Sequence, residues 1–150
     1  MPESENINNI SKFEDKSLLI VDDDSPFRER LARAMEKKGF KVSQAEGVKK
    51  GIDCVKKEKP AFAVVDLRLA DGNGLEVVKE IQNSNVKSRV VMLTGYGNIP
   101  TAVAAIKQGA IDYLAKPADA DDVERALLAE PNQKAAPPEN PMSADRVKWE

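Results

Sequence analysis

Histidine is absent from this chain of 150 residues, and cysteine occurs only once. Without histidine, the chain by itself cannot form a Ser-His-Asp triad, a Cys-His pair or a His-ligated zinc site. The single cysteine, Cys54, excludes a disulfide framework and favours a reducing, cytoplasmic location. No apolar run is long enough to span a bilayer, and the first residues do not have the pattern of a signal peptide. We therefore expect neither a histidine-dependent site nor a membrane segment.

An excess of one charge sign is also missing, since 23 Lys and Arg residues oppose 25 Asp and Glu residues, for a formal net charge of -2. This balance gives no argument for direct binding to nucleic acid or to a membrane surface. Hydrophobic residues make up 41% of the chain, and its length fits one domain with a core. We therefore expect a globular domain rather than a disordered chain.

Short apolar runs alternate with amphipathic segments along the middle of the chain. Runs such as LLIV at 18–21 are typical of strands that are buried on both faces. The first helix is expected to begin at Ser25, as the N-cap, with Pro26 at the first helical position. The expected strands are 18–21, 40–43, 61–65, 90–93 and 111–115, and the expected helices include 27–35, 48–55, 75–81, 100–109 and 123–127.

Five strands that alternate with five helices predict an α/β fold with a parallel sheet covered on both faces. We expect right-handed crossovers and a flavodoxin-like, doubly wound sheet with the strand order 2-1-3-4-5 that this class adopts. In such a sheet, ligands bind beyond the carboxyl ends of the strands.

The two ends of the chain differ in composition from its middle. Residues 1–16 are polar and are interpreted as a flexible leader, and residues 17–129 as the folded domain. Four prolines fall within 131–141, so residues 130–150 are interpreted as an extended linker. Ser143 is a candidate cap for the first helix of an output domain that is missing from this chain.

Polar side chains with reactive groups follow four of the expected strands. Asp22 and Asp23 follow the first strand, Asp66 the third, Thr94 the fourth and Lys116 the fifth. Carboxylates placed together raise one another's pKa values unless a hard cation such as Mg²⁺ lies among them. A carboxylate can attack phosphorus, and phosphoryl transfer mainly requires positioning and charge neutralisation. The set thus contains a nucleophile, a metal site, a cation and a hydroxyl donor.

Each of these residues has a structural explanation when it is taken alone. An acidic run is most often the start of a helix, and an aspartate after a strand often caps a turn. Thr94 and Lys116 alone are ordinary surface residues, and Tyr113 alone is a partly buried aromatic residue of a strand. Their joint occurrence at successive strand ends has few structural explanations, and this joint pattern favours a functional site.

Residues 17–129 resemble the response-regulator receiver (CheY-like) family throughout. The segment LLIVDDDSPF is similar to the family's first strand and acidic pair, and VVMLTGYG to its fourth-strand segment. VVDLRLADGNGLE is similar to the phosphorylation segment, and DYLAKP to the segment that carries the family lysine. The resemblance implies a domain that takes a phosphoryl group from a sensor histidine kinase onto an aspartate.

The resemblance also implies roles for the matched residues. It makes Asp66 the phosphoacceptor, assisted by Lys116 and Thr94, in a signalling protein rather than an enzyme with turnover. It further implies a Mg²⁺ cofactor, with ligands from Asp22, Asp23, Asp66 and the backbone carbonyl of Arg68.

Thr94 and Tyr113 are implied as the switch residues, and the bond from Lys116 to its proline as cis. The chain departs from many family members at Ala70, where they have proline, and at Ala118, where they have phenylalanine. Neither position supplies a reactive group, so these departures leave the phosphorylation site intact.

A narrower resemblance connects the chain with the RegA/PrrA/ActR group of redox-responsive regulators. It is carried by LTGYGNIPTAVAAIKQGAIDYLAKPADADDV and by the tail PPENPMSADRVKWE. In that group a helix-turn-helix of the Fis type follows the proline-rich linker, which implies transcriptional control. We expect contact with DNA only through this missing output domain, and pairing of two copies on phosphorylation.

Three other functions are compatible with parts of the sequence. A haloacid-dehalogenase-like phosphatase would use Asp22 as nucleophile and Asp24 as acid and base, but the residues at the other strand ends fit it less well. A nucleic-acid-binding module would require a basic stripe or an RNA-binding motif, and the chain has neither. A receiver-shaped adaptor that works without phosphorylation would not require the intact acidic set.

Overall fold

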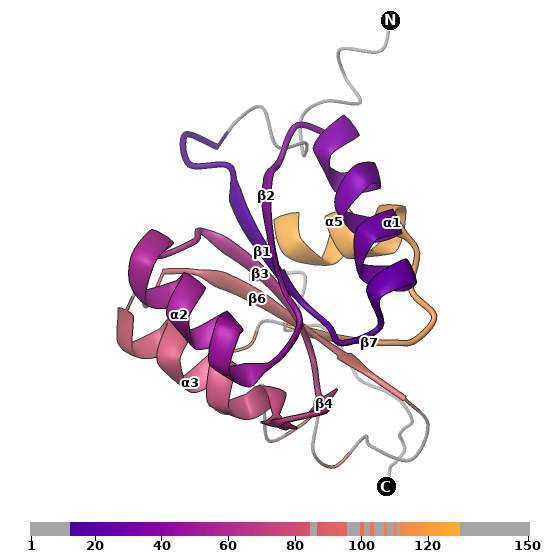
Figure 1. Cartoon of the computed structure of the whole chain (residues 1–150). Coiled ribbons are helices and arrows are strands. Elements are labelled where there is room, and N and C mark those ends of the chain that lie inside the picture. The colour runs from indigo at the N-terminus through magenta and orange to yellow at the C-terminus, as the bar shows by residue number, and fades with distance from the viewer. Residues whose placement is uncertain are drawn as a thin grey trace, which may run out of the picture.

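A computed structural model describes residues 13–84, 87–95, 100, 103, 107, 110 and 112–129. Its centre is a sheet of five parallel strands in the order β2-β1-β3-β6-β7 (Figure 1). The strands are β1 (Ser17–Val21), β2 (Lys41–Ala45), β3 (Phe62–Asp66), β6 (Arg89–Thr94) and β7 (Asp112–Ala115). Because β6 and β7 are the fourth and fifth strands of this sheet along the chain, the predicted order 2-1-3-4-5 is confirmed.

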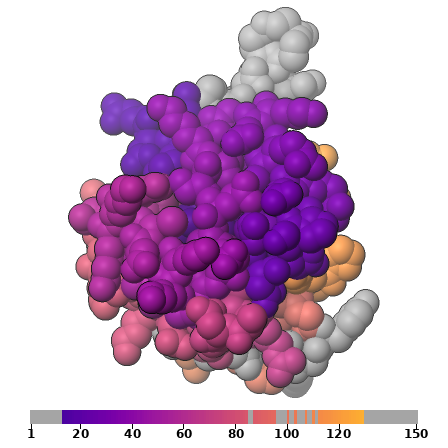
Figure 2. Space-filling model, viewed as in Figure 1, coloured from indigo at the N-terminus to yellow at the C-terminus, as the bar shows by residue number. Residues whose placement is uncertain are grey.

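Helices cover both faces of the sheet (Figure 1). On one face lie α1 (Ser25–Lys37) and α5 (Ala120–Leu128), and on the other lie α2 (Val48–Glu58) and α3 (Gly74–Ser84). In the space-filling view, side chains of the N-terminal half, coloured indigo to magenta, cover most of the visible face (Figure 2). The sheet is therefore enclosed between two helical layers, as a doubly wound fold requires.

Alternate residues of the central strands enter different hydrophobic cores. In β1, Leu18 and Ile20 pack in the core beneath α1 and α5, whereas Leu19 and Val21 pack in the core beneath α2 and α3. All four are at most 1% exposed. Because residues 18–21 are buried on both faces of the strand, none of them faces solvent, which explains their continuous apolar sequence. Burial of each such side chain stabilises the fold by roughly 1.5–3 kcal/mol. The strand is therefore fixed in position, and so are the residues that follow its carboxyl end.

A short antiparallel hairpin follows β3, where the sequence pattern indicates only a turn. It consists of β4 (Arg68–Leu69) and β5 (Gly72–Asn73). Between these strands, the Asp71 carboxylate accepts hydrogen bonds from the backbone N–H groups of Val48 at 2.7 Å and Lys49 at 3.2 Å. These bonds hold the pKa of the Asp71 carboxyl below its usual value. The hairpin is thus tied to the start of α2.

The packed domain extends beyond its predicted N-terminal boundary. The Phe13 ring lies edge-on to Phe62, with 5.3 Å between ring centroids, and the Arg89 guanidinium lies 5.3 Å from the Phe13 ring centre. Arg89 also donates to the backbone carbonyls of Leu127 and Ala129, at 3.2 and 2.9 Å. The end of the expected leader therefore packs on the domain close to the end of α5.

Several predicted segments fall outside the described residues. These are most of the leader, at 1–12, most of the fourth helix, at 100–109, and the proline-rich linker, at 130–150. The predicted fifth helix is α5, and the predicted strand 111–115 is β7 apart from its first residue, which is not described. Within the described residues, no helix combines the length and apolar character needed to cross a membrane.

Candidate functional site

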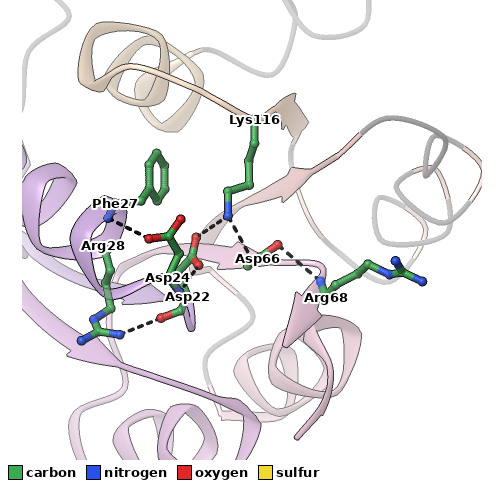
Figure 3. A network of polar contacts seen from close by, with 7 residues as sticks. All are labelled: Asp22, Asp24, Phe27, Arg28, Asp66, Arg68 and Lys116. Carbon is green, nitrogen blue, oxygen red and sulfur yellow. Dashed lines mark hydrogen bonds and ion pairs between the residues drawn. The ribbon is translucent and has the colours of Figure 1, made fainter. Parts of the chain in front are cut away.

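The predicted acidic residues meet at the carboxyl edge of the sheet. Asp22 and Asp23 directly follow β1, and Asp66 ends the neighbouring strand β3. One carboxylate oxygen from each of the three lies within 4.8 Å of the others. Lys116, after β7, points into this cluster (Figure 3), with its Nζ 3.0 Å from Asp22 Oδ2 and 3.4 Å from Asp66 Oδ2. The fold thus joins residues that lie up to 94 positions apart.

Backbone and ring contacts position Lys116 beside the carboxylates. Its backbone N–H donates to the Thr94 carbonyl at 2.8 Å, and its peptide bond to the following proline is cis, as the family resemblance implies. The ammonium also lies 4.9 Å from the centre of the Phe27 ring. Burial acts to lower the pKa of Lys116, but the hydrogen bonds and negative charges of Asp22 and Asp66 outweigh it and raise that pKa. Lys116 is therefore a fixed cation at physiological pH.

Asp66 is a nearly buried carboxyl group, with 7% of the residue exposed. Burial, followed by the negative charge of Asp22, raises the pKa of Asp66 to about 6, although Lys116 acts in the opposite direction. The backbone N–H of Arg68 donates to Asp66 Oδ1 at 3.3 Å. At the start of α3, Gly74 lies so close to the Asp66 carbonyl that a side chain there would collide with it. The Arg68 N–H thus contacts the carboxyl group, and α3 packs closely against the backbone of the same residue.

The structure corrects the predicted start of α1. The N-cap is Asp24, whose carboxylate accepts a hydrogen bond from the Phe27 N–H at 3.1 Å, and Ser25 is the first helical residue. The N–H of Asp24 donates to Asp22 Oδ1 at 2.9 Å, which directs the extended backbone of Asp24 toward the helix. Capping directs this carboxylate toward the start of α1 rather than toward an acid and base role beside Asp22. The geometry therefore does not support the phosphatase alternative, which requires Asp24 in that role.

Thr94 and Arg68 each contact a residue of the site through the backbone, and Tyr113 lies in the neighbouring strand β7. Thr94 ends β6, is 1% exposed, and donates its hydroxyl to the Gly95 carbonyl at 3.2 Å. Tyr113, in β7, is half-buried against the core beneath α2 and α3. The Arg68 side chain points away from the carboxylates in Figure 3, and its backbone N–H makes the contact with Asp66. The switch and metal-ligand roles implied for these residues stay predictions.

Two residues of α1 support the site but are not identified from the sequence. Arg28 is 9% exposed and donates to the Asp22 carbonyl at 2.8 Å and to Gln44 Oε1 at 2.9 Å. Phe27 supplies the ring beside Lys116. The sequence shows only that Arg28 is a charged residue next to the apolar face of a helix. Most arginines in such positions are exposed. Its burial therefore becomes visible only in the tertiary structure.

The donor set fits a hard divalent cation. Asp22 and Asp66 are buried, Asp23 is exposed, and one oxygen of each lies in the same cluster. Lys116 opposes part of their negative charge, and the pKa of Asp66 is still raised, first by burial and then by the negative charge of Asp22. Mg²⁺ prefers oxygen ligands, with a few carboxylates among them. The residues present therefore suit Mg²⁺.

A doubly wound parallel sheet with aspartates and a lysine at its carboxyl edge defines a receiver-type signalling domain. The chain belongs to this family, because residues 18–128 match the response regulator receiver domain. It is 60% identical over 136 residues to the acid tolerance regulatory protein ActR of Rhizobium meliloti (strain 1021), which covers 91% of this chain and 70% of ActR. It is also 60% identical over 136 residues to the photosynthetic apparatus regulatory protein RegA of Rhodobacter capsulatus, covering 91% of this chain and 74% of RegA.

Solved structures agree with this assignment. A response regulator from Burkholderia pseudomallei, crystallised with a phosphorylated aspartic acid, a calcium ion and citrate, matches with a TM-score of 0.75 and 37% identity, over 81% of this chain and 72% of that chain. The receiver domain of NtrX from Brucella abortus matches with a TM-score of 0.67 and 32% identity, over 75% of this chain and 99% of that chain.

The chain is thus the receiver domain of a two-component response regulator, homologous to ActR and RegA. Response-regulator receiver domains are signalling domains that sensor histidine kinases phosphorylate. The predicted family and the narrower resemblance to the RegA and ActR group are both confirmed. The phosphatase alternative is not supported.

Replacing the Asp66 carboxyl should stabilise the metal-free chain at neutral pH. Because the pKa of Asp66 is raised from 3.8 to about 6, the folded state binds this proton more tightly than the unfolded state does. Stability is therefore lost as the pH rises from 3.8 through about 6, and the loss is complete above that value. We expect Asp66→Asn to increase the free energy of unfolding by about 1–2 kcal/mol near neutral pH in urea titrations, and by less at about pH 4.5.

Asp24→Asn is the matched control, because it removes a charge of the same sign nearby and keeps an oxygen that can cap α1. We expect this control to change the free energy of unfolding by less than about 0.5 kcal/mol. An Asp66→Asn variant that is no more stable than the parent at neutral pH would contradict the electrostatic explanation.

Proposed function

We propose that Asp66 of this receiver domain is the residue that accepts a phosphoryl group from a sensor histidine kinase. The observation that carries this proposal is the position of Asp66 beside Asp22, Asp23 and Lys116 at the carboxyl edge of the sheet. A nucleophile, a cation and further carboxylates for a metal lie within reach of one incoming phosphoryl group.

In the proposed reaction, a carboxylate oxygen of Asp66 attacks phosphorus, and the bond from phosphorus to the donor nitrogen of the kinase breaks. The Lys116 ammonium lies beside the Asp66 carboxylate and neutralises negative charge on the phosphoryl group. When bound by Asp22, Asp23, Asp66 and the Arg68 carbonyl, Mg²⁺ would supply further positive charge. Burial and the fixed backbone around Asp66 position its carboxylate, so little rearrangement is needed.

We further propose that Thr94 and Tyr113 transmit the phosphorylated state. The Thr94 hydroxyl, which donates to the Gly95 carbonyl, is to exchange this bond for one to a phosphoryl oxygen. This exchange draws the end of β6 inward and leaves space for the half-buried Tyr113 ring to turn. A few kcal/mol is enough to move a two-state equilibrium across its range. The face that includes β7 and α5 would then change shape.

The partners of this face are also proposals. A second copy of the chain is one, and a DNA-binding output domain that follows the receiver domain in the full protein is another. DNA would be contacted through that output domain, which fits the balanced charge of this chain. We propose a cytoplasmic location, which the single cysteine and the absence of a disulfide framework favour.

Phosphorylation is tested by intact mass after incubation with acetyl phosphate and Mg²⁺. We expect one phosphoryl adduct on the parent chain, because Lys116 contacts the carboxylates of Asp22 and Asp66, and of these two Asp22 is completely buried whereas Asp66 is 7% exposed. Asp66→Asn should show no adduct. An adduct of the same yield in this variant would remove Asp66 as the acceptor.

Metal binding should depend on Asp23 more than on Asp24. Asp23 offers an oxygen to the carboxylate cluster, whereas the Asp24 carboxylate caps α1. We expect Asp23→Asn to weaken Mg²⁺ binding by about tenfold or more, and Asp24→Asn by less than about threefold, in titrations followed by amide chemical shifts. Equal losses in the two variants would contradict this division of roles.

The switch proposal predicts that Thr94→Ala separates phosphorylation from its transmission. The variant retains Asp66 and Lys116, so it should still gain one adduct with acetyl phosphate. The amide chemical shifts of residues 112–118 should then change much less on phosphorylation than they do in the parent chain. If both chains show the same shift pattern, the signal leaves the site by another route.

A further inference from the structure

A buried arginine on α1 touches the backbone of the acidic site. Arg28 is 9% exposed, and its guanidinium is directed toward the loop after β1 (Figure 3). Its NH1 group donates to the Asp22 carbonyl at 2.8 Å, and its Nε donates to Gln44 Oε1 in β2 at 2.9 Å. Its NH2 group lies 4.0 Å from the exposed Glu29 carboxylate, a contact too long and too solvated to position the guanidinium.

The carbonyl that Arg28 binds belongs to the peptide group between two of the three clustered carboxylates. The C=O of Asp22 and the N–H of Asp23 share one rigid plane, so a hydrogen bond to the carbonyl fixes the orientation of both residues. The other groups of Asp22 are also engaged: its N–H donates to the Ala45 carbonyl at 3.1 Å, and its carboxylate accepts from Asp24 and Lys116. Asp22 is therefore held at every polar group.

Asp23 differs from Asp22 in this respect. Its side chain is exposed, and within the described residues its carboxylate accepts no hydrogen bond from the protein. The direction of this side chain is thus set by the backbone on either side of it. On one side, Arg28 holds the Asp22–Asp23 peptide group, and on the other, the Asp24 N–H is fixed to Asp22 Oδ1. The free carboxylate of the cluster depends on these two backbone contacts.

We propose that Arg28, anchored on Gln44, is a positioning residue that holds the Asp22–Asp23 peptide group in the orientation required for metal binding and phosphorylation at Asp66. This inference rests on the proposed function. The planar guanidinium is suited to the role because it donates in two fixed directions at once, to a side chain of β2 and to the loop after β1. Arg28 need not touch the metal or the phosphoryl group.

The sign of a mutational effect separates this role from simple electrostatics. Arg28 is a cation near a cation-binding site, so removing its charge alone should strengthen Mg²⁺ binding. Removing its two hydrogen bonds should instead weaken binding, because the Asp23 carboxylate loses its fixed direction. A role limited to attaching α1 to β2 would lower stability and leave the Mg²⁺ dissociation constant of the folded chain unchanged.

The test is a Mg²⁺ titration of the full chain followed by amide chemical shifts, with intact mass after acetyl phosphate treatment as a second readout. For Arg28→Met we expect about tenfold weaker Mg²⁺ binding, the lower end of the usual loss for residues behind metal ligands. Phosphorylation should return toward the parental rate at saturating Mg²⁺. Gln44→Leu keeps the charge and removes its anchor, and it should weaken binding in the same direction.

Arg33→Met is the matched control, because Arg33 is an exposed arginine on the same helix. We expect it to leave Mg²⁺ binding unchanged or slightly tighter. Binding as tight as the parent's or tighter in Arg28→Met overturns the inference, and if that variant does not fold, parental binding in Gln44→Leu overturns it. A parent chain that neither binds Mg²⁺ nor gains an adduct overturns the proposed function itself, and this inference with it.

Discussion

Three carboxylates, those of Asp22, Asp23 and Asp66, stand with oxygens within 4.8 Å of one another at the edge of the sheet, and their mutual repulsion opposes folding. Its effect is visible in the pKa of Asp66, which burial and the charge of Asp22 raise to about 6. Lys116 offsets part of this repulsion through contacts at 3.0 and 3.4 Å. The cluster persists because the elements that carry it are fixed by burial elsewhere in the domain.

The central strands provide that burial. β1 and β3 are covered on both faces, so the residues at their carboxyl ends are carried by segments that cannot shift without opening two cores. The elements after each strand add further restraints on the site. Gly74 lets α3 approach the Asp66 carbonyl, and Asp71 ties the intervening hairpin to α2. The carboxylates that form the site therefore destabilise the fold, whereas the buried layers beneath them both stabilise the fold and position the site.

The first turn of α1 has several functions at once. Asp24 caps the helix and is itself oriented by Asp22, Phe27 places its ring beside the Lys116 ammonium, and Arg28 reaches back to the Asp22 carbonyl. These three residues follow the acidic pair closely in sequence, so a shift of the helix would disturb the cation, the carboxylates and the backbone between them. The first turn of α1 therefore cannot move without moving the residues of the site.

The sequence by itself determined the elements and the chemistry of the site. Continuous apolar runs indicated strands buried on both faces, and Asp22, Asp23, Asp66 and Lys116 could be assigned to one edge because parallel strands end on the same side of a sheet. Only the tertiary structure decided which neighbouring groups hold that site. The burial of Arg28 and the contact of Phe27 with Lys116 depend on distances between elements, and the use of Asp24 rather than Ser25 as the cap depends on where the backbone turns into the helix. Local sequence patterns report periodicity along one segment. They do not show which remote segments pack together, and they do not place the start of a helix to within one residue.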